Sequence, residues 1–296
     1  MSEPSLVKGD LEKKKKVRRA THCFVAHLAN GRTSRLQAAM FRNHYDGDTT
    51  TWSPQGRIHQ IEYAMEAVTQ GSAVVGIKSR KHVVIATVKR SAGELGSYQQ
   101  KLFKIDDHLA IGMSGLSADA RVLCKYMRSE CLNHKFVYAS PIQVGRLVLQ
   151  VADKSQVHTQ RYGRRPYGVG LLVAGYDQTG AHLYETCPSG NYFDYRAQAI
   201  GGRFQSAKTY LERRLASFEG SSLDELIRHS LFALRETLAS GAPGTEKDAE
   251  TKLTPQNVSI AVLGEGTPFA LLEGAALQPY LDRLDTPVAA PAAMEH

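Results

Sequence analysis

Side chains that could bind a metal or act as nucleophiles are scattered along this sequence. The four cysteines are widely separated, without a CxxC pair, and no histidines cluster at the spacing of a zinc site. A structural metal or a disulfide framework would need closely spaced ligands or cysteine pairs. We therefore expect no metal site, no cofactor and a reducing compartment. The cysteines concerned are Cys23, Cys124, Cys131 and Cys187.

A run of three threonines at residues 49–51 is the first candidate for a hydroxyl nucleophile. Such a hydroxyl is a weak nucleophile until a neighbouring base activates it in a fixed geometry. No strand follows the run that could hold it in place. We interpret these threonines as part of a turn or an N-terminal loop.

An amphipathic helix is predicted directly after this loop. Ser53 can cap its start and Pro54 can occupy its first position, while Gly71 marks its end. Apolar residues recur every three or four positions, so one face of the helix must cover an apolar surface. They are Ile58, Ile61, Met65 and Val68.

Strand-like and helix-like segments then alternate in pairs along the chain. Ser117 opens one helix and Ser140 with Pro141 opens the next. The apolar side of the first is predicted to carry Val122, Leu123, Tyr126, Met127 and Leu132. The strands are expected at residues 72–77, 82–88, 108–114, 169–175, 182–187, 192–200, 258–264 and 269–272, the later helices at 201–215 and 223–238, and connections at 101–107 and 239–255.

This order of elements predicts the fold class. Paired strands that alternate with paired helices disfavour the βαβ repeat of a Rossmann fold. They favour an α+β protein with two stacked, mainly antiparallel sheets covered by helices on both outer faces. We therefore predict a four-layer αββα sandwich.

Charge is distributed unevenly along the 296 residues. Residues 1–39 carry nine lysines or arginines and three acids, a net +6 out of the +8 of the whole chain. They lack periodicity, which predicts a disordered basic arm, and residues 13–19 could be a nuclear import signal or a solvated tail. Residues 40–284 form the predicted domain, and residues 285–296 a flexible tail. The near-neutral body disfavours a nucleic-acid partner.

The cellular location of the protein is predicted from two features that its sequence lacks. No apolar run approaches the ~18 residues of a membrane helix, so we expect no membrane partner. The N-terminal residues do not have the pattern of a signal peptide, which argues against secretion. We expect the protein in the cytoplasm and the nucleus.

Several segments resemble the alpha-type subunits of the proteasome core particle. The longest is the run from Trp52 to Val68, WSPQGRIHQIEYAMEAV, with Tyr45 and Asp46 before it. Further matches are SGL at residues 114–116, ADAR at 118–121, QRYGRRPYGV at 160–169 and AIG at 199–201. The resemblance holds in register from residue 40 to about 284, so a chance match to a short motif is not a concern. An extension of 39 residues before Met40 departs from the family pattern.

The resemblance implies the fold of N-terminal-nucleophile hydrolases but not their activity. Catalytic relatives use a free N-terminal threonine, tuned by an acid and a lysine. The matching positions here are Ser72, which follows Gly71 in the chain, then Val88, and Lys101. Only the lysine is retained, so we predict a non-catalytic subunit. The alternatives left open are an active N-terminal-nucleophile hydrolase and, more remotely, a basic-armed nucleic-acid binder.

The resemblance also implies partners: other alpha subunits in a seven-membered ring, beta subunits, and a regulatory particle or other activators. In such a ring Tyr45, Asp46, Pro54 and Tyr63 order a substrate-entry gate for ubiquitin-dependent degradation. Polar residues 45–48 suit a mobile strap that bonds a neighbour. The family's activator-docking positions correspond to Lys101, Glu62, Gly56, Gly71, Gly115 and Leu116. Each also has a plain structural interpretation, such as a helix residue, a helix-stop glycine or a solvated charge.

Overall fold

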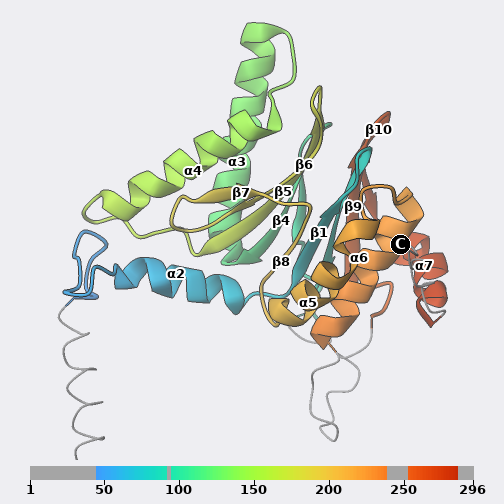
Figure 1. The fold of residues 1–296 in the computed structure, drawn as a ribbon. Coiled ribbons are helices and arrows are strands. Elements are labelled where there is room, and N and C mark those ends of the chain that lie inside the picture. Colours follow the sequence, from blue (N-terminus) through green and yellow to red (C-terminus); the bar gives the residue numbers. More distant parts are fainter. Residues whose placement is uncertain (1–44, 92–94, 239–252, 286–296) are drawn as a thin grey trace, which may run out of the picture. The chain divides into compact units, whose positions relative to one another are not determined.

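The computed structural model describes residues 45–91, 95–238 and 253–285 (Figure 1). These residues belong to two units, one up to His59 and one from Gln60 onward. The predicted arm at residues 1–39 and nearly all of the predicted C-terminal tail lie outside the described residues.

A tight turn in the first unit delays the start of the first described helix. The backbone nitrogen of Gly56 donates to the carbonyl of Ser53 (2.9 Å), and the nitrogen of Arg57 donates to Ser53 Oγ (3.0 Å). Gly56 has a φ of 75°, a left-handed conformation that cannot continue a right-handed helix. Helix α2 therefore spans His59–Thr69, and the prediction that Ser53 and Pro54 open it is wrong.

Ten strands of the second unit form two five-stranded sheets, and every neighbouring pair is antiparallel. The first sheet has the order β10-β9-β2-β1-β8, and the second has the order β3-β4-β5-β6-β7. In the first sheet the strands are β1 (Val74–Lys78), β2 (His82–Val88), β8 (Ala197–Ile200), β9 (Val258–Gly264) and β10 (Thr267–Leu272). In the second they are β3 (Leu102–Asp106), β4 (Leu109–Gly115), β5 (Val169–Asp177), β6 (Gly180–Thr186) and β7 (Tyr192–Asp194).

Helices cover the outer face of each sheet (Figure 1). Helices α3 (Ser117–Tyr138) and α4 (Val144–Gln160) pack on the second sheet. Helices α5 (Phe204–Arg214) and α6 (Leu223–Leu238) pack on the first, next to the short α7 (Gln278–Asp282). Three single 3₁₀ turns complete the described elements: η1 (Leu215–Ser217), η3 (Gly274–Leu277) and η4 (Arg283–Asp285).

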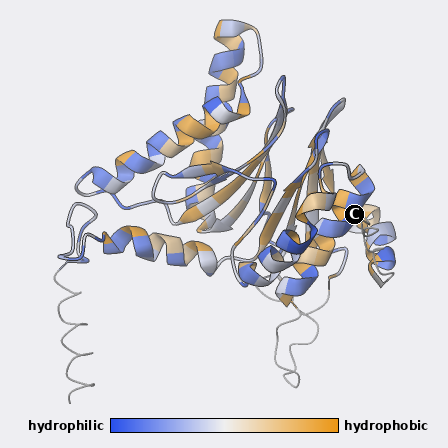
Figure 2. Ribbon diagram, viewed as in Figure 1, coloured by the Kyte–Doolittle hydropathy of each residue, from blue (hydrophilic) through white to orange (hydrophobic). Residues whose placement is uncertain are grey.

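Three apolar clusters show why this arrangement is stable. One lies between the sheets and includes Val74, Ile85 and Leu172, all fully buried. The other two join each sheet to its own helices, and Figure 2 shows the apolar strands at the centre of the layers. Burial of apolar surface on both faces of each sheet is the dominant favourable term in folding. The predicted four-layer αββα sandwich is confirmed.

Two strand predictions were wrong. Residues 101–107, predicted as a connection, contain strand β3, which pairs with β4. The predicted strand at 192–200 is two strands in different sheets. Tyr195 donates its backbone N–H to Leu183 of β6 (2.8 Å), whereas the next carbonyl, of Arg196, accepts from Lys78 of β1 (2.9 Å). The chain thus passes from the second sheet to the first between Tyr195 and Arg196. The alternation of apolar residues in the sequence does not reveal this crossing.

The predicted apolar side of α3 was partly wrong as well. Leu123 and Met127 are buried, but Val122 and Leu132 are 53% and 69% exposed. Cys131 takes a buried position instead. The apolar residues of this helix are spread over a wider arc than one face, so spacing alone could not choose among them.

Candidate functional site

Ser72, the residue at the position of the family's nucleophile, is sealed inside the chain. It is buried, and helix α2 and Gly71 precede it, so its nitrogen is part of a peptide bond. Its Oγ has no hydrogen-bond partner among the described residues. Without a free amine or another base within reach, this hydroxyl cannot be activated.

The acid position of the catalytic relatives is occupied by an apolar residue in the structure too. Val88 is the last residue of β2 and belongs to the apolar cluster under α5 and α6. Its backbone nitrogen bonds the carbonyl of Ala73 (3.3 Å), next to Ser72 in the chain. The residue at this position therefore supplies no carboxylate to the serine.

Lys101 is the one retained member of that constellation, and its environment is unusual. The residue is only 4% exposed, yet no described carboxylate lies within ion-pair distance of its ammonium. Burial, with a smaller effect of the Arg90 charge, lowers the pKa of Lys101. A largely buried cation without an anion is costly, because less water solvates the charge than in solution. The site is therefore suited to an external anion.

Two of the predicted docking glycines meet at the junction of α2 with strand β4. A Cβ on Gly71 would stand 2.5 Å from the backbone nitrogen of Gly115, which is closer than atoms can pack. Gly115 itself has a φ of 111°, and a Cβ there would stand 2.3 Å from the carbonyl oxygen of Gly168. Both positions therefore require glycine for close approach of the backbone.

Leu116 and the Lys101 backbone lie near this junction. The nitrogen of Leu116 donates to the carbonyl of Gly168 (2.9 Å), and the Leu116 side chain is 48% exposed. The carbonyl of Lys101 accepts from Met113 (3.1 Å), two residues before Gly115. Four of the six predicted docking residues, Lys101, Gly71, Gly115 and Leu116, are thus gathered around the end of β4.

The remaining two predicted docking residues are not brought into this group by any described contact. Glu62 lies half-buried on α2. Gly56 belongs to the turn of the first unit, where its left-handed φ shapes the chain before α2. For Gly56 the structure supports the plain interpretation of a turn glycine.

The predicted gate residues lie on a short, locally bonded segment and on α2. Tyr45 and Asp46 are half-buried, whereas Pro54 is exposed in the turn before α2. The carboxylate that organises this segment is Asp48, which accepts from the nitrogen of Thr49 (2.7 Å) and from Thr50 Oγ1 (2.6 Å). These hydrogen bonds lower the pKa of Asp48, and the bond from the Thr50 hydroxyl has the largest effect. The threonine run is thus part of a turn, as predicted.

Tyr63 projects from α2 and is 38% exposed. The neighbouring Met65 is also exposed, at 47%, although it was predicted on the covered stripe. The buried side of α2 is turned toward Ala64 instead, so that Tyr63 and Met65 remain accessible.

Asp119, in the ADAR motif, has a structural role. Its two carboxylate oxygens accept from Arg165 Nη1 and Nη2 at 2.7 and 2.9 Å, and one of them also accepts from the nitrogen of Gly168 (3.0 Å). The hydrogen bond from Arg165 has the largest effect on the pKa of Asp119, and it lowers that pKa. The carboxylate ties the first turn of α3 to the segment that enters β5, as expected for a charge at a helix start.

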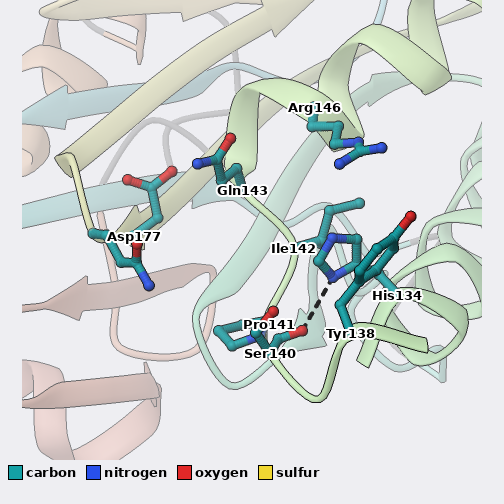
Figure 3. Close-up of a pocket in the computed structure, with 9 residues that line it drawn as sticks. His134, Tyr138, Ser140, Pro141, Ile142, Gln143, Arg146 and Asp177 are labelled. Atoms are coloured by element: carbon teal, nitrogen blue, oxygen red, sulfur yellow. Dashed lines mark hydrogen bonds between the residues drawn. The ribbon is translucent and has the colours of Figure 1, made fainter. Parts of the chain in front are cut away.

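A cavity of about 250 Å³ lies at the other end of α3, where α3 turns into α4 (Figure 3). His134 Nδ1 bonds the carbonyl of Ser140 (3.1 Å) and shapes one wall. On the opposite side the carboxylate of Asp177 accepts from the backbone nitrogen of Val144 (3.2 Å). It caps α4 although it is distant from this helix in sequence. His134 and Asp177 in the cavity wall thus make local hydrogen bonds. None of the predicted site residues lines the cavity.

No group of three or more histidine, cysteine or carboxylate side chains in the described part of the chain could hold a metal ion. Among the described helices, none is both long and apolar enough to cross a membrane.

Comparisons with known proteins agree with the resemblance. The family model described as "Proteasome subunit" matches residues 68–251, and a second model, for the N-terminal signature of the A-type proteasome subunits, matches residues 45–67. The alpha type-1 proteasome subunit of Dictyostelium discoideum is 61% identical over 83% of this chain and 96% of its own length.

Two more distant relatives give the same picture. The probable alpha type-6 proteasome subunit of Schizosaccharomyces pombe is 53% identical, over 83% of this chain and 87% of its own length. The alpha type-1 proteasome subunit of Caenorhabditis elegans is 47% identical, over 83% and 92% respectively.

Proposed function

Because this chain belongs to the proteasome subunit family, as one of its non-catalytic alpha-type members, we propose that it forms part of the substrate-entry gate and carries a docking pocket for activators. Within the assembled ring, its proposed neighbours are six other alpha-type subunits, with beta subunits beneath them. The substrates are proteins destined for ubiquitin-dependent degradation, in the cytoplasm and the nucleus.

The observation that carries the docking proposal is the Lys101 side chain, which is only 4% exposed and has no described anionic partner. A protein keeps such a costly group where a ligand of opposite charge uses it. The C-terminal carboxylate of an activator would supply that charge and form a charge-assisted hydrogen bond. The exposed side chain of Leu116 offers an apolar contact nearby.

Gating is supported by the character of the segment that precedes α2. Residues 45–51 are polar, with Asp48 holding a local turn, and they are followed by an exposed proline. The hydrogen bonds of Asp48 in the described part of the chain are local ones to Thr49 and Thr50, so the turn can keep its own shape if the segment changes position. The hydroxyl of Tyr63 and the carboxylate of Asp46 are groups that can order it through hydrogen bonds in the ring.

Docking is tested by replacing Lys101 with alanine in the assembled core particle. We expect the Kd for purified regulatory particle to rise by at least about threefold, which corresponds to roughly 0.7 kcal/mol. Lys104→Ala is the matched control, because Lys104 is a half-exposed lysine three residues farther along the chain, in β3, and pairs with Asp107 (2.6 Å). Equal affinities for the two variants would remove the docking role.

Gating is tested separately by deleting residues 1–48. We expect the core particle that contains the shortened chain to hydrolyse small peptides faster in the absence of any activator. An unchanged basal rate would show that this segment does not obstruct the entrance.

A further inference from the structure

We propose that Ser114 is the positioning residue that couples the Lys101 docking pocket to helix α2. The proposal rests on the proposed docking function. The hydrogen bonds of the Ser114 hydroxyl in the described part of the chain are to backbone carbonyls.

The Ser114 hydroxyl joins two elements that are distant in sequence. Ser114 is fully buried in strand β4, and its Oγ donates to the carbonyl of Val68 in the last turn of α2 (2.9 Å). The carbonyl of Ser72, just beyond α2, lies 3.3 Å from the same oxygen. The carbonyl of Val68 also accepts from the nitrogen of Gly71 (3.1 Å), so Ser114 adds a second bond to it, one that comes from another element.

Contacts with predicted docking residues occur on both sides of Ser114 along the chain. Met113 before it bonds the carbonyl of Lys101 (3.1 Å), while Gly115 and Leu116 follow it directly. A ligand that contacts Lys101 and Leu116 therefore engages β4 immediately next to the hydroxyl that holds α2.

The packing around this hydroxyl leaves no room for independent movement. A Cβ on Gly71 would lie 2.2 Å from Ser114 Oγ, and a Cβ on Gly201 would lie 2.6 Å from it. Closely packed interiors transmit displacements, since a shift of one group must move its neighbours. A small change at the end of β4 is therefore passed to the last turn of α2.

Helix α2 is also the element through which such a change can reach the gate. It is continuous in sequence with residues 45–58, which contain the proposed gate residues Tyr45, Asp46 and Pro54. Ser114 thus stands between the group that would bind an activator and the helix that follows the strap.

The experiment compares Ser114→Ala with Ser230→Ala in the assembled core particle. Ser230 is an equally buried serine whose hydroxyl bonds the carbonyl of Ile227 within its own helix (2.7 Å), so the control removes a hydroxyl without separating two elements. Two quantities are measured: the Kd for purified regulatory particle and the rate of peptide hydrolysis when that particle is saturating.

For Ser114→Ala we expect the stimulated rate to fall to about half of the wild-type rate or less, with the Kd changed by less than about twofold. A merely structural serine would instead lower the yield of particle and leave the stimulation of each particle unchanged. If Ser114→Ala does not assemble, Ser114→Cys retains the volume with a weaker donor, and we expect it to lower the stimulated rate in the same direction.

The proposal is overturned if the assembled Ser114 variant is stimulated as strongly as Ser230→Ala. Two further arms separate that result from a failure of the proposed function. If Lys101→Ala binds the regulatory particle normally, or the deletion of residues 1–48 leaves the basal rate unchanged, the docking or gating role itself fails. If both behave as expected while Ser114→Ala is normal, only the coupling role of Ser114 is wrong.

Discussion

The two ends of helix α3 differ in how closely the rest of the chain packs around them. At its start, the junction of α2 with β4 is packed so closely that Gly71 has no space for a methyl group. At its far end, large apolar side chains stand in solvent: Leu132 is 69% exposed, Phe136 89%, Val137 66% and Tyr138 58%. The first end is tightly packed beneath the proposed docking residues, and the other exposes apolar area that is suited to contact with another subunit.

The comparison separates residues that stabilise the fold of this chain from residues that are available for contact with another subunit. The junction combines glycines, a buried hydroxyl and backbone hydrogen bonds, none of which requires a second protein. The exposed end offers apolar area that a single chain gains nothing by displaying. Three substitutions test the comparison.

The largest expected effect comes from Gly71→Ala at the junction. The new Cβ would lie 2.2 Å from Ser114 Oγ and 2.5 Å from the nitrogen of Gly115, so α2 or β4 must shift. We expect a loss of about 2 to 4 kcal/mol in the free energy of unfolding, measured with denaturant on the purified chain. Gly220→Ala is the control, since no atom lies within 4 Å of the Cβ it would add. Equal stability of the two variants would mean that the junction is not tightly packed.

A smaller effect is expected from Asp119→Asn at the start of α3. The variant keeps the shape but loses the charge that Arg165 and Gly168 bind, at a cost of about 1 to 3 kcal/mol at pH 7. Because the folded state lowers the pKa of Asp119, its contribution is present above the carboxyl's unfolded pKa and is lost as pH falls through the folded pKa. The stabilities of variant and wild type should therefore converge in acid. A difference that does not depend on pH would contradict the ion pair.

The smallest effect on stability is expected from Phe136→Ser at the exposed end of α3. The isolated chain should change by less than about 0.5 kcal/mol, because the ring is already in solvent. Incorporation into the core particle should fall, measured as the fraction of tagged chain recovered in assembled particles, relative to Asn133→Ser on the same helix. Normal incorporation would indicate that this end of α3 is not an interface.

Local pattern predicted most elements of the fold. Strands β2 and β9 and helix α6 have the predicted bounds, because long apolar periods and clear turns delimit them. The pairing of strands with helices was enough to predict four layers. Strand β3 was missed because its five residues alternate Lys and Asp with apolar residues, which is typical of a connection as well as of an edge strand.

The candidate site was predicted only through the family resemblance. Spacing alone does not distinguish Lys101 from a solvated lysine, and Gly71 alone indicates no more than the end of a helix. The signal that could have indicated Ser114 is the cluster of small residues at 112–115, interrupted by one methionine, since small residues allow backbones to approach.

Residue types and periods along the chain were enough to predict the layered fold, and long motifs in register were enough to predict the family, because both are read from neighbouring residues. Only the tertiary structure decided that Lys101 is buried without a described partner, that Ser114 holds the end of α2, and that Cys131 rather than Leu132 lies inside. Burial and partnership depend on residues far apart in sequence, and only folding brings these together.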